Sequence, residues 1–195
     1  MGYAKPFKLV AVNGSSREAS RTGALVRALA DAISVRIPVE TVTVNLADGA
    51  SGLLAAPDRA RLGEDGEALI RRIEAADILI VGTPVYRASY TGLLKHVFDL
   101  VYLDALAGKV AVLAATGGSP LHGLVTEHQL RPLLGFFGTY TVPTAVYATQ
   151  ADFNETQLIN PAITARIERA ASEAARLLDR QALVVPSPVV LAKSA

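Results

Sequence analysis

Residues 8–23, KLVAVNGSSREASRTG, determine how the rest of the chain is interpreted. A short apolar run, Lys8–Val12, leads directly into a polar segment, Asn13–Gly23, and apolar residues then recur with helical spacing from Leu25 to Ile33. Because the apolar run has no polar alternation, both of its faces should be buried, as in a parallel sheet covered by helices. The stretch therefore predicts a strand, a loop and a helix, which together begin a β-α-β unit.

The same alternation of strand and helix continues along the chain. Four further apolar runs are predicted to be strands: Val39–Leu46, Ile78–Val81, Val110–Ala115 and Tyr140–Tyr147. Apolar stripes with helical spacing occupy residues 69–73, 93–101, 124–134 and 163–178. Five strands alternating with five helices predict an α/β fold, and they fit a doubly wound, flavodoxin-like parallel sheet with strand order 2-1-3-4-5. Pro143 in the last strand indicates that this strand lies at an edge.

The regions between and after these elements are less regular. Asn160 and Pro161 are suited to cap and begin the last helix. Residues 47–63 carry no clear periodicity and are expected to form a long loop. Residues 1–181 are predicted to form a single domain, and the apolar, proline-containing tail, residues 182–195, is expected to pack on its own domain or on a neighbouring subunit.

Composition excludes several classes of function. The chain has 195 residues, 51% of them hydrophobic, and no cysteine, which removes disulfides, thiolate catalysis and cysteine-bound metals. A formal charge of +1 gives no reason to expect binding to nucleic acid. Without a signal-peptide pattern or an apolar run of roughly 20 residues, we expect a soluble, cytoplasmic protein that does not enter a membrane.

The loop after the first strand has the composition of a phosphate-binding site. It carries hydroxyl groups on Ser15, Ser16, Ser20 and Thr22, and guanidinium groups on Arg17 and Arg21. Hydroxyls, arginines and the amides of a helix N-terminus all bind a phosphate dianion well. The loop matches neither the Walker A nor the GxGxxG pattern. The alternative is an ordinary polar loop in which Thr22 caps the helix.

Two more loops follow neighbouring strands and should open into the same crevice. Gly82–Gly92 places a proline and then Tyr86 after the third strand, an arrangement that can form a wall along a flat ring. Thr116–Pro120 contains two glycines, which allow the backbone to approach a ligand closely. The alternatives are that Tyr86 and Tyr90 are packing residues and that the glycines form a tight turn. Taken together, the three loops predict a site for FMN.

Three motifs resemble those of the NADPH-dependent FMN reductase family. They are Gly14-Ser15-x-Arg17, Thr83-Pro84-Val85-Tyr86-x-x-x-Tyr90-x-Gly92-x-Leu94-Lys95 and Ala115-Thr116-Gly117-Gly118. The resemblance extends roughly from Lys8 to Ala148. Within the family the chain is most similar to the two-component reductases of alkanesulfonate and methanesulfonate assimilation, which supply reduced FMN to a separate monooxygenase.

The resemblance implies a set of cofactor-binding residues. The FMN phosphate would be held by Ser15, Arg17, Ser20 and Thr22. The isoalloxazine ring would lie along Pro84, Val85, Tyr86 and Arg87, with Thr116, Gly117, Gly118 and Ser119 on its other side. The hydride donor would be NADPH, or NADH, and Arg17, Arg21 and Arg87 are the candidates to select the 2′-phosphate. Hydride transfer depends on positioning, so we assign no catalytic acid or base and no metal.

The resemblance also implies a homodimer or homotetramer. The alkanesulfonate reductases carry a one-residue insertion, a π-bulge at the subunit interface, in the fourth helix, and its position falls on His128. Without the family, His128 would be interpreted as an exposed helix residue. Two other functions remain open: a quinone, azo or chromate reductase that retains FMN, and a flavodoxin-like electron carrier. Such carriers are strongly acidic, so the charge of +1 disfavours the second.

Overall fold

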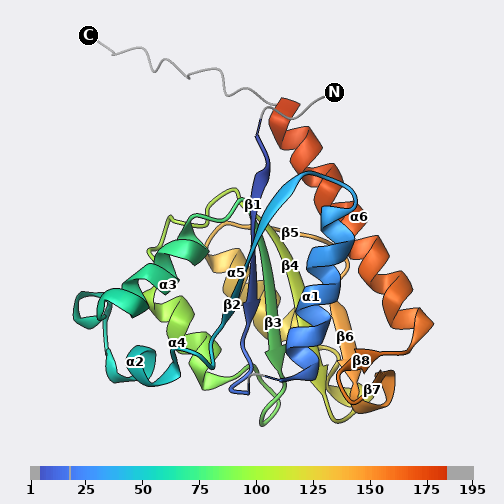
Figure 1. Cartoon of the computed structure of the whole chain (residues 1–195), viewed down its shortest axis with the longest axis horizontal. Coiled ribbons are helices and arrows are strands. Elements are labelled where there is room, and N and C mark those ends of the chain that lie inside the picture. Colours follow the sequence, from blue (N-terminus) through green and yellow to red (C-terminus); the bar gives the residue numbers. More distant parts are fainter. Residues whose placement is uncertain (1–4, 18, 184–195) are drawn as a thin grey trace.

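The computed structural model describes residues 5–17 and 19–183, which form a parallel sheet enclosed by helices (Figure 1). The six strands of the sheet are β1 (Phe7–Asn13), β2 (Val39–Asn45), β3 (Ile78–Pro84), β4 (Val110–Gly117), β5 (Tyr140–Thr141) and β6 (Val146–Thr149). Their order is β2-β1-β3-β4-β5, β6 also pairs with β4, and every pair is parallel. The predicted flavodoxin-like order is confirmed.

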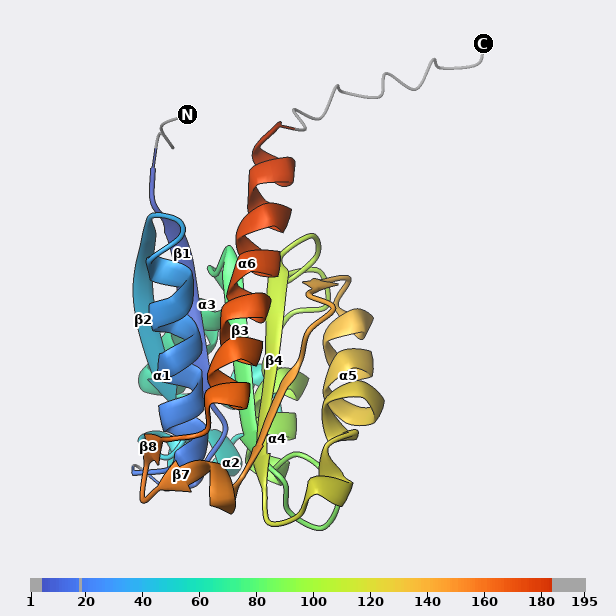
Figure 2. The ribbon, with the colours of Figure 1, turned by 90° about the vertical axis from the view of Figure 1, so that its right-hand side faces the viewer.

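Helices cover both faces of this sheet (Figure 2). They are α1 (Arg21–Ser34), α2 (Ala50–Ala55), α3 (Glu64–Glu74), α4 (Gly92–Leu100), α5 (Arg131–Phe136) and α6 (Pro161–Leu183). Leu9 and Ala11 of β1 pack in the core beneath α1 and α6, whereas Val10 and Val12 pack beneath the helices of the other face. Because both of their faces are buried, β1, β3 and β4 show no polar alternation, whereas the edge strand β2 alternates and is only partly buried.

The first helix packs unusually close to the sheet. Gly82 of β3 lies directly under α1, and a Cβ atom there would be 2.2 Å from Cγ2 of Val26. The amide of Gly14 donates to the carbonyl of Gly82 at 2.7 Å, which fixes the loop after β1 against the end of β3. Both contacts hold the N-terminus of α1 beside the carboxyl ends of β1 and β3.

The last predicted strand, Tyr140–Tyr147, was expected to be continuous, and this was wrong. The structure contains two short strands, β5 and β6, that pair with β4 one after the other around a break at Pro143. Buried Glu173 of α6 accepts hydrogen bonds from the amide and hydroxyl of Thr144, both at 2.8 Å, and so satisfies polar groups that the sheet leaves unpaired. The prediction of an edge was correct, because β5 and β6 pair with β4 and with no other strand among the described residues.

The expected loop at residues 47–63 is also corrected, since it contains α2 and a short 3₁₀ turn, Arg59–Arg61. Arg59 holds this segment in place: its guanidinium donates to Glu67, to Glu74 and to the carbonyl of Leu100. It also lies 4.6 Å from the ring centroid of Tyr102. The hydrogen bond from Arg59, helped by one from Arg71, lowers the pKa of Glu67 to about 2.

Three other features complete the chain. A π-helical segment, Thr126–Leu130, precedes α5 and includes the exposed His128, at the position that the resemblance implies. A two-stranded hairpin, β7 (Phe153–Asn154) and β8 (Gln157–Leu158), follows β6. Asn160 caps α6 as expected, its Oδ1 accepting from the amide of Ala162 at 2.9 Å. The tail was expected to pack on its own domain or on a neighbouring subunit, and its residues from 184 onward lie outside those that the structure describes.

The remaining helices follow their predicted stripes. Thr91 caps α4 through a hydrogen bond from the amide of Leu94 at 3.1 Å, and Lys95 forms an ion pair with Asp99 one turn further along the helix.

Within residues 5–17 and 19–183, no helix is both long enough and apolar enough to span a lipid bilayer.

Replacing Glu173 with glutamine should destabilise the fold in a pH-dependent way. Burial alone would raise the pKa of Glu173, but hydrogen bonds from Thr144 and Arg169 outweigh burial and hold the pKa below 4.5. The stabilisation is therefore present above pH 4.5 and is lost as the pH falls through the folded-state pKa. We expect the variant to lose about 1–3 kcal/mol of unfolding free energy at pH 7. Urea titrations should show that the difference in unfolding free energy between the native protein and the variant becomes smaller in acid. An equal difference at pH 7 and pH 3 would contradict the assignment.

Candidate functional site

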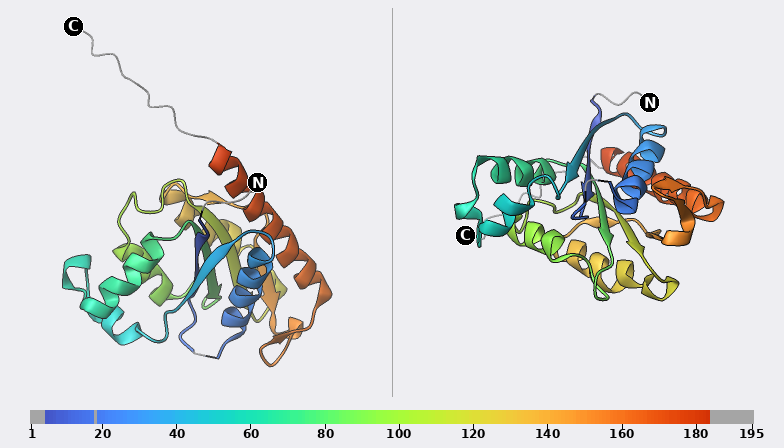
Figure 3. Two further views of the ribbon diagram at one scale, coloured as in Figure 1. Left: turned by 45° about the horizontal axis from the view of Figure 1, so that its top comes forward. Right: turned by 60° about the horizontal axis from the view of Figure 1, so that its bottom comes forward.

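A cavity of about 450 Å³ lies at the carboxyl ends of β1, β3 and β4, an end of the sheet that the right panel of Figure 3 brings forward. The loops that follow these strands contribute ten of the twelve residues predicted for the site: Ser15, Arg17, Ser20, Thr22, Pro84, Val85, Tyr86, Thr116, Gly117 and Gly118. Arg87 and Ser119 lie outside the lining. The parallel topology therefore brings the three loops to one place.

Hydrogen bonds within the first loop fix its shape. The side chain of Asn13 accepts from the amide of Ser15 at 3.2 Å, and the hydroxyl of Ser15 accepts from the amide of Arg17 at 3.1 Å. Ser20 rather than Thr22 caps α1, accepting from the amide of Gly23 at 3.0 Å. The loop therefore curls around the N-terminus of α1, where the first amides have no partner within the helix.

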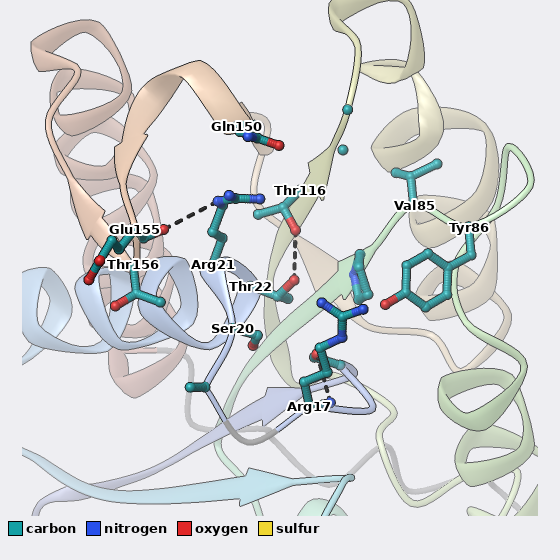
Figure 4. A pocket seen from close by; sticks show the side chains of 15 residues that line it. Arg17, Ser20, Arg21, Thr22, Val85, Tyr86, Thr116, Gln150, Glu155 and Thr156 are labelled. Atoms are coloured by element: carbon teal, nitrogen blue, oxygen red, sulfur yellow. Dashed lines mark hydrogen bonds between the residues drawn. The ribbon is translucent and has the colours of Figure 1, made fainter.

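The first and third loops meet through two threonines. Thr22 and Thr116 are both buried, and their hydroxyl oxygens lie 2.6 Å apart (Figure 4). This contact joins the first turn of α1 to the end of β4 across the base of the cavity. A hydroxyl that is already bonded to another hydroxyl can still accept or donate once more, so both groups can also serve a ligand.

Tyr147 on β6 packs against the third loop and holds its backbone in place. Its hydroxyl donates to the carbonyl of Ser119 at 2.6 Å, and a Cβ atom on Gly117 would lie 2.1 Å from the same hydroxyl oxygen. Burial raises the pKa of Tyr147, and the charge of Asp152 adds to this shift, so the phenol remains a donor. No atom lies within 4 Å of a Cβ placed on Gly118, which faces open space. The side chain of Ser119 caps the next turn by accepting from the amide of Leu121.

The second loop is a tight turn that presents Tyr86. The amide of Val85 donates to the carbonyl of Thr116 at 2.7 Å, which ties the loop to β4. Tyr86 and Ser89 exchange backbone hydrogen bonds of 2.9 and 3.2 Å, which close the turn around Arg87 and Ala88. Tyr86 is 47% exposed, and its ring lies at the cavity wall (Figure 4).

Sequence reasoning missed one wall of the cavity, the turn of the β7–β8 hairpin. Gln150, Glu155 and Thr156 line this side, and Nε of Arg21 donates to the carbonyl of Glu155 at 3.2 Å (Figure 4). Buried Asp152 anchors the hairpin by accepting from the amide and hydroxyl of Thr149 and from the side chain of Asn160. The strands of this hairpin are two residues long, so the sequence carried no periodic signal for them.

The donor set of the cavity fits FMN. One end offers hydroxyls, two arginines and the N-terminus of α1, which together suit a phosphate dianion. The other end is lined by Pro84, Val85 and the two glycines of the third loop, where backbone can approach a flat ring. Gly118 leaves open space on this side that a larger residue would fill. Over the described residues, no group of three or more His, Cys, Asp or Glu residues is placed to hold a metal ion.

Comparison with known proteins agrees with this geometry. The sequence profile of the NADPH-dependent FMN reductase family matches residues 7–153. The NADH-dependent FMN reductase SfnF of Pseudomonas fluorescens is 49% identical over 173 residues, which cover 89% of this chain and 92% of that protein. A protein of Pseudomonas aeruginosa named FMN reductase (NADPH) is 45% identical over 172 residues, covering 88% and 92% of the two chains.

The fold comparison gives the same result. The crystal structure of an oxidoreductase from Corynebacterium diphtheriae superposes with a TM-score of 0.79 at 31% identity, covering 90% of this chain and 98% of that one. The chain belongs to the NADPH-dependent FMN reductase family. It is therefore an NAD(P)H:FMN oxidoreductase by class, with a flavodoxin-like fold, as its three motifs imply.

Alanine at the two adjacent glycines should have different effects. Gly117→Ala places a methyl group against the hydroxyl of Tyr147, so we expect a loss of about 1–3 kcal/mol of unfolding free energy. Gly118→Ala meets no protein atom, so its stability should match the native protein while FMN binding weakens. Thermal unfolding and FMN titration of both variants check this pair. Native FMN affinity in Gly118→Ala would show that the ligand does not approach this residue.

Replacing Arg17 with alanine should weaken FMN binding by roughly 1.5–3 kcal/mol, the scale of a charge-assisted hydrogen bond. Because the lost contact is to phosphate, riboflavin should bind the native protein less tightly than FMN and should bind the variant and the native protein equally. Fluorescence titrations with both flavins measure this. If the Arg17→Ala variant binds FMN with unchanged affinity, the phosphate does not bind at the first loop as we expect.

Proposed function

We propose that the protein transfers a hydride from NADPH or NADH to FMN and supplies reduced FMN to a separate flavin-dependent monooxygenase of organosulfonate assimilation. The single observation that carries the proposal is the composition of the cavity, which combines a phosphate-binding end with a backbone-lined slot for a ring. The similarity to SfnF, named an FMN reductase, supports the choice of substrate.

In this proposal the first loop binds the phosphate. Ser15, Arg17, Ser20 and Thr22 would contact the phosphate oxygens together with the amides that begin α1. Arg17 supplies a full positive charge, and its two parallel N–H groups can bind two oxygens at once. Arg21 is already bonded to the carbonyl of Glu155, so it has the further task of holding the hairpin wall beside the phosphate.

The other two loops would hold the ring. Pro84, Val85 and Tyr86 are proposed to lie along the isoalloxazine, and Thr116, Gly117 and Gly118 to approach it from the other side. Arg87 and Ser119 adjoin these two groups in the chain but do not line the cavity. FMN, when bound, supplies the electron-accepting centre, so the protein needs no acid, base or nucleophile for the transfer. What the chain contributes is a rigid wall that holds the two reactants at a separation of roughly 3–3.5 Å.

We propose that the protein works as a homodimer or homotetramer. An apolar cavity of about 420 Å³ lies between α4 and α5, lined by Phe98, Leu103 and Phe136 among others. The side chains of Leu103 and Phe136 are 64% and 71% exposed. Large apolar groups gathered on one surface are typical of a protein–protein contact, and the adjoining π-helical segment with His128 belongs to the same side of the sheet.

Steady-state kinetics after gel filtration test the proposed function. A reductase that supplies FMN should elute without flavin and oxidise NADPH or NADH at a rate that saturates with micromolar free FMN. The ratio of kcat/KM for the two nucleotides then identifies the preferred donor. If the protein elutes yellow and needs a quinone, dye or chromate before it oxidises the nucleotide, it is a reductase that retains FMN. A flavin-bound protein without any nucleotide oxidation would be an electron carrier.

A further inference from the structure

The turn that carries Tyr86 has a strained backbone. Its two central residues, Arg87 and Ala88, have φ angles of 51° and 66°, so both occupy the left-handed region although neither is glycine. Two-residue hairpin turns of this kind are normally built from Asn-Gly or Gly-Gly, because a side chain makes the conformation costly. Strain of this kind persists only where the surrounding structure holds the backbone in place.

The base of the turn is well held. The amide of Val85 is bonded to β4, and the amide of Thr91 donates to the hydroxyl of Thr83 at 3.2 Å. The hydroxyl of Thr91 in turn donates to the carbonyl of Gly14 at 2.9 Å, so the base is also fixed to the first loop. These contacts leave the tip, residues 86–89, projecting beyond the sheet.

One side-chain contact holds the tip from outside the turn. The hydroxyl of Ser89 donates to Oε1 of Gln129 at 3.3 Å, and both residues are half-buried. Gln129 belongs to the π-helical segment, in which it lies between the buried residues Thr126 and Leu130. A π segment holds more residues per turn than an α-helix, so the direction of Gln129 relative to those buried neighbours depends on this local geometry.

We infer that Gln129 is a positioning residue: from the π-helical segment it holds the strained Tyr86–Ser89 turn in the conformation that forms the cavity wall. This inference rests on the proposed function for its kinetic consequence, because Tyr86 is proposed to lie along the flavin ring. The geometric part concerns this chain alone. The π-helical segment thereby has a task inside its own subunit, which is to support the wall of the cofactor site.

Removing the contact from either side should have the same effect. Gln129→Leu and Ser89→Ala each delete the hydrogen bond, and we expect each to raise the KM for FMN about three- to tenfold with kcat within about twofold. The double variant should match the single variants, since only one contact is lost. Gln129→Glu keeps an acceptor for Ser89 and should restore native kinetics. Ser34→Ala, which removes a seryl hydrogen bond at the far end of α1, is the matched control.

Hydrogen exchange tests the inference without flavin. The amides of Tyr86 and Ser89 are bonded across the turn, so Gln129→Leu should speed their exchange about three- to tenfold while the amides of β3 and β4 keep native rates. Adding Ala88→Gly to the Gln129→Leu variant should slow the exchange of these two amides again, because glycine adopts positive φ without steric cost. Unchanged exchange and kinetics in both single variants would overturn the inference. A native protein that fails to reduce FMN would instead overturn the proposed function, and the exchange data would still decide the role of Gln129.

Discussion

Helix α1 can pack against β3 only because residue 82 has no side chain. A Cβ at Gly82 would lie 2.2 Å from Val26, so even alanine would push the helix away from the sheet. The close contact places the first turn of α1 at the ends of β1 and β4, where Thr22 meets Thr116. Amides at a helix N-terminus bind anions only at short range. The position of the proposed phosphate-binding end of the cavity relative to the proposed ring-binding end therefore depends on this one packing contact.

Much of this arrangement could be predicted because it rests on local patterns. Runs such as Lys8–Val12 are buried on both faces, and burial on both faces leaves a continuous apolar signal in the sequence. The right-handed connection of parallel strands then dictates which loops share a crevice. Ten of the twelve residues predicted for the site line the cavity. The two that do not are Arg87, which has a positive φ in a tight turn, and Ser119, which caps a 3₁₀ turn, and such local backbone geometry leaves no pattern in the sequence.

The parts that could not be predicted depend on contacts between segments distant in the sequence. The segment with α2 has no strong periodicity and is held by Arg59, whose partners Glu67 and Glu74 come later in the chain. The hairpin wall of the cavity has strands of two residues, and Asp152 and Arg21 fix its place. The break between β5 and β6 needs Glu173, 29 residues further along, to satisfy Thr144. In each case one or two side chains with polar partners decide the arrangement.

The interrupted edge formed by β5 and β6 also limits how copies of the chain can associate. An uninterrupted edge strand offers a row of free amides and carbonyls on which another chain can add a strand, the route to open-ended aggregates. Here the edge consists of a two-residue and a four-residue strand with Pro143 between them, and proline has no amide hydrogen to donate. On this side the sheet therefore offers few free backbone amides and carbonyls to which a strand of a second molecule could bond. The opposite edge, β2, is an unbroken strand of seven residues, so this constraint applies to the β5–β6 side alone, where a second copy of the chain would have to meet side chains rather than add a strand.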